Sequence, residues 1–261
     1  MPTLAVQTYT VRKHLKSPAA IETTFARLKE LGVSVVELAR IKFEPAEIAA
    51  VARACQSNDM QVGSSQITLD YLSKNFDWVV DFHRQLNCTN VAVSVLPVAL
   101  IIGGVEKWYD FAKQLDELGA KYAESGLNLL FHHHDFEFRK YDGKLGLDIL
   151  LANTSPENLG LVIDTYWTQR GGRSPENMII DYADRVKVVH LRDFMIRWKY
   201  FDLLPQDCEL GQGNLDIKRI VQSCIDAKVE FMAIEQTSSK PFDSIATSVK
   251  HLHTLGFAES F

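Results

Sequence analysis

Short apolar runs rich in β-branched residues recur along the whole chain and alternate with polar segments of helical spacing. Each run is unbroken enough to form a strand that is buried on both faces of a sheet. Between the first two runs, Ile21, Phe25 and Leu28 are spaced by four and three residues, which places them on one face of a helix. The predicted strands cover residues 4–8, 33–38, 60–64, 90–95, 127–132, 159–164, 186–191 and 231–236.

Helix start and stop signals stand between these runs. Ser17 can cap a helix whose first turn contains Pro18, and Gly32 suits its end. Ser174 and Pro175 repeat the same start signal later in the chain. The sequence therefore predicts that strands and helices alternate.

This alternation predicts one α/β domain. A strand, a helix and two loops need roughly 30 residues, so eight such units fill the 261-residue chain. We therefore expect a single (β/α)8 barrel over residues 1–261, with no second domain. The widest gap contains an aromatic stretch at 194–201, which we interpret as part of an inserted loop around 194–213. A lid, a subunit contact of a homodimer and a packed loop all remain open for this insertion.

Composition narrows the class of protein. A net charge of -5, a pI near 5.9 and the lack of a long basic run argue against nucleic acid as a partner. No apolar run is long enough for a membrane span, and the first residues lack a secretory signal pattern, so we expect a cytoplasmic protein. The four cysteines are far apart and indicate neither a disulfide framework nor a cysteine zinc site.

Potential metal ligands follow four consecutive predicted strands. The fifth strand ends in the segment His132 to Glu137, and the next three end at Asp164, His190 and Glu235. In a (β/α)8 barrel the carboxyl ends of the strands form the active-site face, so these side chains can converge. Carboxylates mixed with imidazole suit Mn2+, Mg2+, Co2+ or Zn2+. The sequence therefore predicts a site for one divalent ion.

Several motifs extend beyond these ligands. They are QTYTVR at 7–12, VEL at 36–38, FHHHDFEF at 131–138, IDTYW at 163–167, VHLRD at 189–193, ELGQG at 209–213 and IEQT at 234–237. In this combination the chain resembles the xylose isomerase-like TIM barrels, the sugar phosphate isomerase/epimerase group, essentially from end to end. The same scaffold serves isomerases, epimerases, dehydratases, lyases and endonucleases, so the resemblance does not specify a reaction.

The resemblance implies one divalent ion, with Mn2+ expected first, held by Glu, Asp, His and Glu from strands five to eight. The last three positions carry Asp164, His190 and Glu235. Many members have a glutamate inside the fifth strand, where this chain has Phe131 or His132. For the first position we therefore expect Glu137, and His132 and His134 remain alternatives.

The resemblance also implies proton transfer on a ketose, keto-sugar or related polyol through an enediolate. Glu137 and Glu235 are the expected acid and base, and His134 is a further candidate. Trp167 stands where family epimerases often carry a histidine, and it can stack on a sugar but cannot transfer protons. The expected substrate-binding residues are Gln7, Tyr9, Arg12, Glu37, His132, Trp167, Arg192 and Asp193.

Three functions follow from this interpretation. The first is a metal-dependent sugar isomerase or epimerase. The second is a lyase or dehydratase of a keto-sugar or inosose, because the histidine-rich fifth strand can supply a general acid. The third is a non-catalytic sugar-binding barrel. An endonuclease is disfavoured because the ends of strands two to four carry no histidines for further zinc ions.

Overall fold

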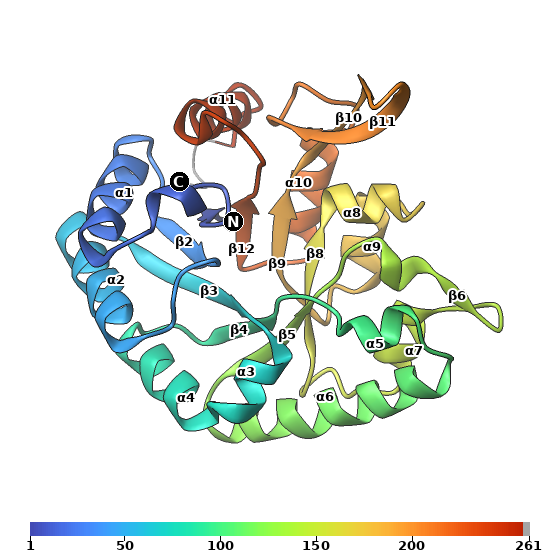
Figure 1. Ribbon diagram of the computed structural model, residues 1–261. Helices are drawn as coiled ribbons and strands as arrows, with labels where there is room; N and C mark the ends of the chain where they lie inside the picture. Colours follow the sequence, from blue (N-terminus) through green and yellow to red (C-terminus); the bar gives the residue numbers. More distant parts are fainter. Residues whose placement is uncertain (258–261) are drawn as a thin grey trace.

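Eight parallel strands form a closed barrel in the computed structural model, which describes residues 1–257. Around the barrel the strands follow the order β1-β12-β9-β8-β5-β4-β3-β2 (Figure 1). The prediction of a single (β/α)8 barrel is confirmed, and each predicted strand overlaps an observed one. The strands are β1 Thr3–Gln7, β2 Val35–Leu38, β3 Gln61–Ile67, β4 Asn90–Val93, β5 Asn128–His132, β8 Gly160–Asp164, β9 Val186–Leu191 and β12 Phe231–Ile234.

Helices surround the barrel (Figure 1). Ser17 and Ser174 cap their helices by accepting hydrogen bonds from the amides of Ala20 and Asn177, as the sequence predicts. No helix within residues 1–257 is long and apolar enough to cross a membrane. The helices are α1 Pro18–Glu30, α2 Pro45–Asn58, α3 Leu69–Lys74, α4 Phe76–Gln85, α5 Val98–Ile101, α6 Glu106–Glu124, α7 Gly146–Ala152, α8 Thr165–Arg170, α9 Pro175–Asp181, α10 Ile217–Asp226 and α11 Pro241–Thr254.

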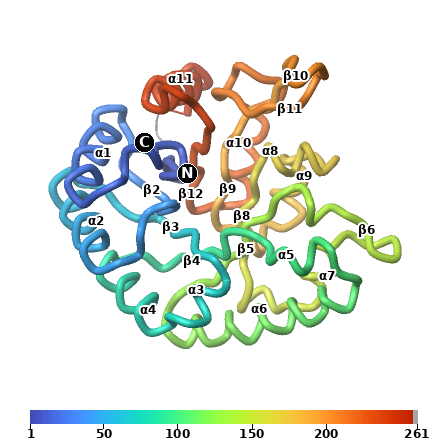
Figure 2. Tube along the Cα trace, viewed as in Figure 1, coloured from blue at the N-terminus to red at the C-terminus, as the bar shows by residue number. Residues whose placement is uncertain are grey.

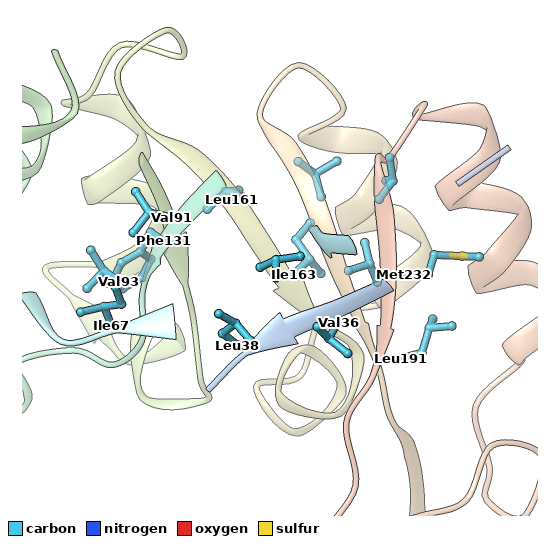
Figure 3. Packing of buried hydrophobic residues seen from close by; sticks show 14 of the residues in the cluster. Val36, Leu38, Ile67, Val91, Val93, Phe131, Leu161, Ile163, Leu191 and Met232 are labelled. Atoms are coloured by element: carbon cyan, nitrogen blue, oxygen red, sulfur yellow. The ribbon is translucent and has the colours of Figure 1, made fainter. Parts of the chain in front are cut away.

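The barrel strands pack on both faces. Residues on the outer face join the helices in a large hydrophobic cluster, and Figure 3 labels members of it such as Val36, Phe131 and Ile163. A second, smaller cluster of buried residues occupies the alternate positions of the strands, which face the barrel interior. We call this set the inner layer: Ala5, Val35, Ala92, Leu130, Val162, Val188 and Ala233.

Polar residues follow the inner layer at the carboxyl ends of the strands. Each lies two residues beyond an inner-layer residue and therefore faces the same side of its strand. The strand register pairs Gln7 with Glu37 and Asp164 with His190, so these side chains are neighbours around the barrel. We call this set the polar layer: Gln7, Glu37, Ser94, His132, Asp164, His190 and Glu235.

The predicted insertion contains an antiparallel hairpin, formed by β10 Asp193–Lys199 and β11 Asp202–Cys208. It projects beyond the ring of helices near α8 (orange in Figures 1 and 2). Its tip exposes Tyr200 by 79% and Phe201 by 93%, and both have positive φ angles. A second, short hairpin joins β6 Lys140–Tyr141 to β7 Lys144–Leu145.

Candidate active site

Four residues of the polar layer face one another at the end of the barrel interior. They are His132 on β5, Asp164 on β8, His190 on β9 and Glu235 directly after β12, and all are buried. One nitrogen or oxygen atom from each lies within 4.8 Å of the others. Asp164 Oδ2 is 3.8 Å from His132 Nε2 and 3.6 Å from His190 Nδ1. We call this group the four-residue cluster.

The four-residue cluster has the properties of a metal site. His132 Nε2 and His190 Nδ1 are buried and have no hydrogen-bond partner among the described residues, although both lie near carboxylate oxygens. Buried polar atoms are normally satisfied, so two such nitrogens at one point need an explanation. Two imidazole nitrogens and two carboxylates form a ligand set that suits borderline divalent ions. The cluster can therefore hold one divalent ion.

Glu37 orients His190 from behind. Its buried carboxylate lies with Oε2 at 2.5 Å from His190 Nε2, so Nδ1 is the nitrogen that faces Asp164 and Glu235. Burial alone lowers the pKa of His190, but Glu37, Asp164 and Glu235 outweigh it and hold this pKa well above its usual range. A carboxylate behind a ligating histidine is the usual outer partner in metal sites, because it fixes the ring and increases its basicity.

Arg192 supplies positive charge beside the two carboxylates. Its Nη1 is 3.3 Å from Asp164 Oδ2 and 3.4 Å from Glu235 Oε1, while Nη2 is 3.1 Å from Asp207 Oδ2. Burial alone raises the pKa of both cluster carboxylates. Arg192 and His190 together outweigh this effect of burial. They keep the pKa of Asp164 well below its usual value and lower the pKa of Glu235 to about 2. Both groups are therefore ionised at neutral pH.

A cavity of about 610 Å3 opens over the four-residue cluster. Its volume lies within the roughly 300–1,000 Å3 of small-molecule sites. Among the residues that the sequence predicts to bind substrate or act as acid or base, the lining contains Gln7, Tyr9, His132, His134, Trp167, Arg192 and Glu235. Gln66 and Asp207 are among the further polar residues of the lining, and neither is a candidate on sequence grounds.

Three expected substrate-binding residues lie behind this lining. Glu37 is buried against His190. Arg12 lies on the Tyr9 ring, 3.8 Å from its centroid, and donates to the Tyr9 carbonyl. Asp193 is fully buried at the base of the β10–β11 hairpin, where its carboxylate accepts hydrogen bonds from four backbone amides. These amides belong to Phe194, Gly211, Gly213 and Leu215.

Glu137 lies in the loop after β5 and belongs neither to the four-residue cluster nor to the lining of the cavity among the described residues. Its Oε2 accepts a hydrogen bond of 2.8 Å from the His134 amide, and burial raises its pKa to about 8. In the cluster His132 occupies the place expected for Glu137. His132 follows inner-layer Leu130 by two residues, as Asp164 follows Val162, and this strand alternation is the signal that identifies it.

Comparisons with known proteins give a family and several relatives. The model of the xylose isomerase-like TIM barrel family matches residues 25–254. An inosose dehydratase from Bacillus cereus (strain AH820) is 30% identical over 102 residues, which are 39% of this chain and 33% of that protein. An inosose dehydratase from Clostridium perfringens (strain 13 / Type A) is 23% identical over 76% of each chain. The first curated relatives are thus matched over about a third of their length.

Solved structures share the fold at low sequence identity. A sugar phosphate isomerase/epimerase from Parabacteroides distasonis superimposes with a TM-score of 0.81 and 16% identity over 98% of this chain and 99% of that one. A D-allulose 3-epimerase from Methylomonas sp. superimposes with a TM-score of 0.73 and 13% identity over 97% of this chain and 98% of that one. A xylose isomerase-like TIM barrel protein from Mycobacterium smegmatis in complex with magnesium superimposes with a TM-score of 0.71 and 11% identity over 100% of this chain and 98% of that one.

Proposed function

Since this chain belongs to the xylose isomerase-like TIM barrel family, we propose that it is a divalent-metal-dependent enzyme that dehydrates a keto-polyol or keto-sugar. The observation that carries the proposal is the four-residue cluster at the base of a cavity with polar groups for hydroxyls. His132, Asp164, His190 and Glu235 would hold the ion, and Mn2+ is the expected metal. The inosose dehydratases among the relatives support this reaction class.

A bound divalent ion would polarise the substrate carbonyl and stabilise the negative charge that develops on its oxygen. Arg192 lies in the cavity wall beside two cluster carboxylates and adds a second positive charge there. Trp167 presents an aromatic wall on which a sugar ring can stack. These groups bind and orient the substrate above the cluster.

His134 is the proposed proton carrier. It lines the cavity, and burial lowers its pKa to about 3, so that the ring is neutral before the reaction and, once protonated, readily gives its proton away. Neutral His134 would take the proton from the carbon beside the carbonyl and then deliver it to the hydroxyl group that leaves as water. One group on one face of the substrate is enough for this reaction. Removal and return of a proton on opposite faces, as expected for Glu137 with Glu235, would require Glu137 in the cavity.

Isomerisation or epimerisation of a ketose is the second candidate. It is favoured by the carboxylates of Glu235 and Asp207, which both line the cavity and contact Arg192. Either carboxylate could return a proton to the substrate at a neighbouring carbon without loss of water. Roles for Arg12 and Asp193 in either reaction would be indirect, because each supports the backbone around the cavity.

The test is a substrate screen with protein loaded with Mn2+. Inososes and ketohexoses are incubated in deuterated water, and the products are identified by mass spectrometry and NMR. Dehydration gives a product that has lost one water, whereas isomerisation gives a product that keeps its composition and gains solvent deuterium. We expect dehydration, its loss in His134→Ala and its retention in the surface variant Lys250→Ala. A protein that binds Mn2+ and the sugars but converts none of them would contradict the proposal in favour of a binding barrel.

A further inference from the structure

The middle histidine of the triple on β5 does not line the cavity. His133 is fully buried, and its ring packs edge to face against Phe138 at 5.3 Å between centroids. Both ring nitrogens are nevertheless engaged with the backbone. Nε2 lies 3.2 Å from the amide nitrogen of Asp164, and Nδ1 lies 3.0 Å from the carbonyl oxygen of His134. One side chain therefore links β8 to the loop after β5.

The partners of His133 determine its protonation. The Asp164 amide can only donate, so Nε2 must be the accepting, unprotonated nitrogen. The His134 carbonyl can only accept, so Nδ1 carries the hydrogen. Thr168 Oγ1 lies 3.3 Å from Nε2 and can donate to the same lone pair.

These bonds hold two residues of the candidate active site. The His134 carbonyl accepts from His133, and the His134 amide donates to Glu137 Oε2 at 2.8 Å, so His134 is fixed from both sides. The main chain of Asp164 is fixed by its amide, while its side chain is held by a bond of 2.9 Å from the Trp167 amide to Oδ1. A shift of the Asp164 backbone would therefore move Oδ2 within the four-residue cluster.

We propose that His133 is a positioning residue that sets the cluster ligand Asp164 and the cavity residue His134 at a fixed distance from each other. The proposal rests on the metal site proposed above. Its role differs from those of its two neighbours: His132 offers a ligand atom, His134 faces the substrate cavity, and His133 connects the backbones. The three consecutive histidines thus carry three separate tasks.

Three variants separate the two bonds. His133→Gln places an acceptor near the Nε2 position and keeps the hydrogen bond from the Asp164 amide. His133→Asn places a donor near the Nδ1 position and keeps the hydrogen bond to the His134 carbonyl. His133→Phe keeps neither bond. Loss of outer partners of metal ligands weakens metal binding by about 10–100-fold, and we expect this range for Asn and Phe. We expect the Mn2+ affinity of His133→Gln to stay close to that of the wild type.

The matched control is His83, another buried histidine with two hydrogen bonds, to Ser65 Oγ at 2.8 Å and to the Val79 carbonyl at 2.7 Å. It lies on α4 outside the cavity lining. His83→Asn should lower the Tm without weakening Mn2+ binding, because it removes a buried bond elsewhere. The readout for every variant is the dissociation constant for Mn2+, measured by competition with a fluorescent chelator, together with the Tm.

The outcomes distinguish this inference from the proposed function. If His133→Asn and His133→Phe bind Mn2+ as tightly as the wild type, His133 is only a packing residue and the inference is wrong. If the wild type binds no Mn2+, the proposed function fails, and 15N NMR of the histidine rings still tests the two hydrogen bonds that His133 makes to the backbone. The expected result there is a hydrogen on Nδ1 of His133 and none on Nε2. A hydrogen on Nε2 would overturn the inference.

Discussion

The inner layer and the polar layer come from the same strands and lie only two residues apart, yet they have opposite characters. Leu130 and Val162 pack in the barrel interior, while His132 and Asp164 face a common point beside the cavity. Strand alternation places both layers on the same face of the sheet. The inner layer packs the barrel, and we propose that the polar layer binds metal, so a substitution in one layer should leave the property of the other intact.

The largest effect is expected from Leu130→Ala in the inner layer. The side chain is fully buried in the barrel interior, and its truncation should lower the free energy of unfolding by about 2–5 kcal/mol. Mn2+ affinity at 10 °C, where the variant is still folded, should equal that of the wild type. Chemical denaturation and metal titration check the two halves of this prediction, and weakened metal binding would show that the layers are coupled.

A pH effect is expected from His83, a buried histidine that belongs to neither layer. Burial lowers its pKa from 6.5 to about 4, so the unfolded chain binds more protons than the folded protein between these values. Its stabilising contribution is therefore complete above about pH 6.5 and is lost as the pH falls toward 4, by up to about 3 kcal/mol. Unfolding experiments from pH 7 to 4 should show a shallower decline in His83→Gln, and an identical decline would contradict the assignment.

Glu37→Ala tests the outer support of the polar layer. The substitution leaves His190 Nε2 without its carboxylate, so the ring can turn and its Nδ1 no longer faces the cluster. Mn2+ affinity should fall by about 10–100-fold, as for other outer partners of metal ligands. Ser64→Ala on β3 serves as the control, because that buried hydroxyl has no hydrogen-bond partner within the described chain. Equal Mn2+ affinities of Glu37→Ala and Ser64→Ala would show that Glu37 does not support metal binding.

The smallest effect is expected at the hairpin tip, outside both layers. Phe201 is 93% exposed with φ of 64°, a backbone conformation that favours glycine. Phe201→Gly should leave Mn2+ affinity unchanged and raise stability by about 1 kcal/mol or less. Analytical ultracentrifugation of the same variant tests whether the insertion is a subunit contact of a homodimer, one of the three interpretations that the sequence leaves open. If the tip is a subunit contact, the wild type is a dimer that the substitution dissociates.

The sequence predicts the fold because each barrel strand is a short apolar run and because start signals such as Ser17-Pro18 and Ser174-Pro175 mark helices between the runs. Strand pairing in a (β/α)8 barrel follows chain order, so no long-range information is required. The β10–β11 hairpin is different. Its strands are largely exposed to solvent, and the turn places Tyr200 and Phe201 at positive φ, where asparagine or glycine is the usual signal. For this reason the segment was expected only as an insertion.

The site was predicted less completely than the fold. Asp164, His190 and Glu235 are strand-end residues, and the structure brings them together. For the fifth strand the resemblance favours Glu137 and leaves His132 and His134 as alternatives, and in the structure His132 is the one that lies beside the other three. Asp207 was missed because it reaches the cavity from the hairpin, through a tertiary contact with Arg192 that no local pattern encodes.

We propose that the four-residue cluster binds one divalent ion while the inner layer beneath it only packs. The most direct measurement is calorimetric titration with Mn2+ of the chelator-treated wild type, Asp164→Ala and Val162→Ala. We expect the wild type and Val162→Ala each to bind one equivalent of Mn2+, and Asp164→Ala to show no measurable binding. Binding of one equivalent by Asp164→Ala with wild-type affinity, or no binding by the wild type, would contradict the proposal.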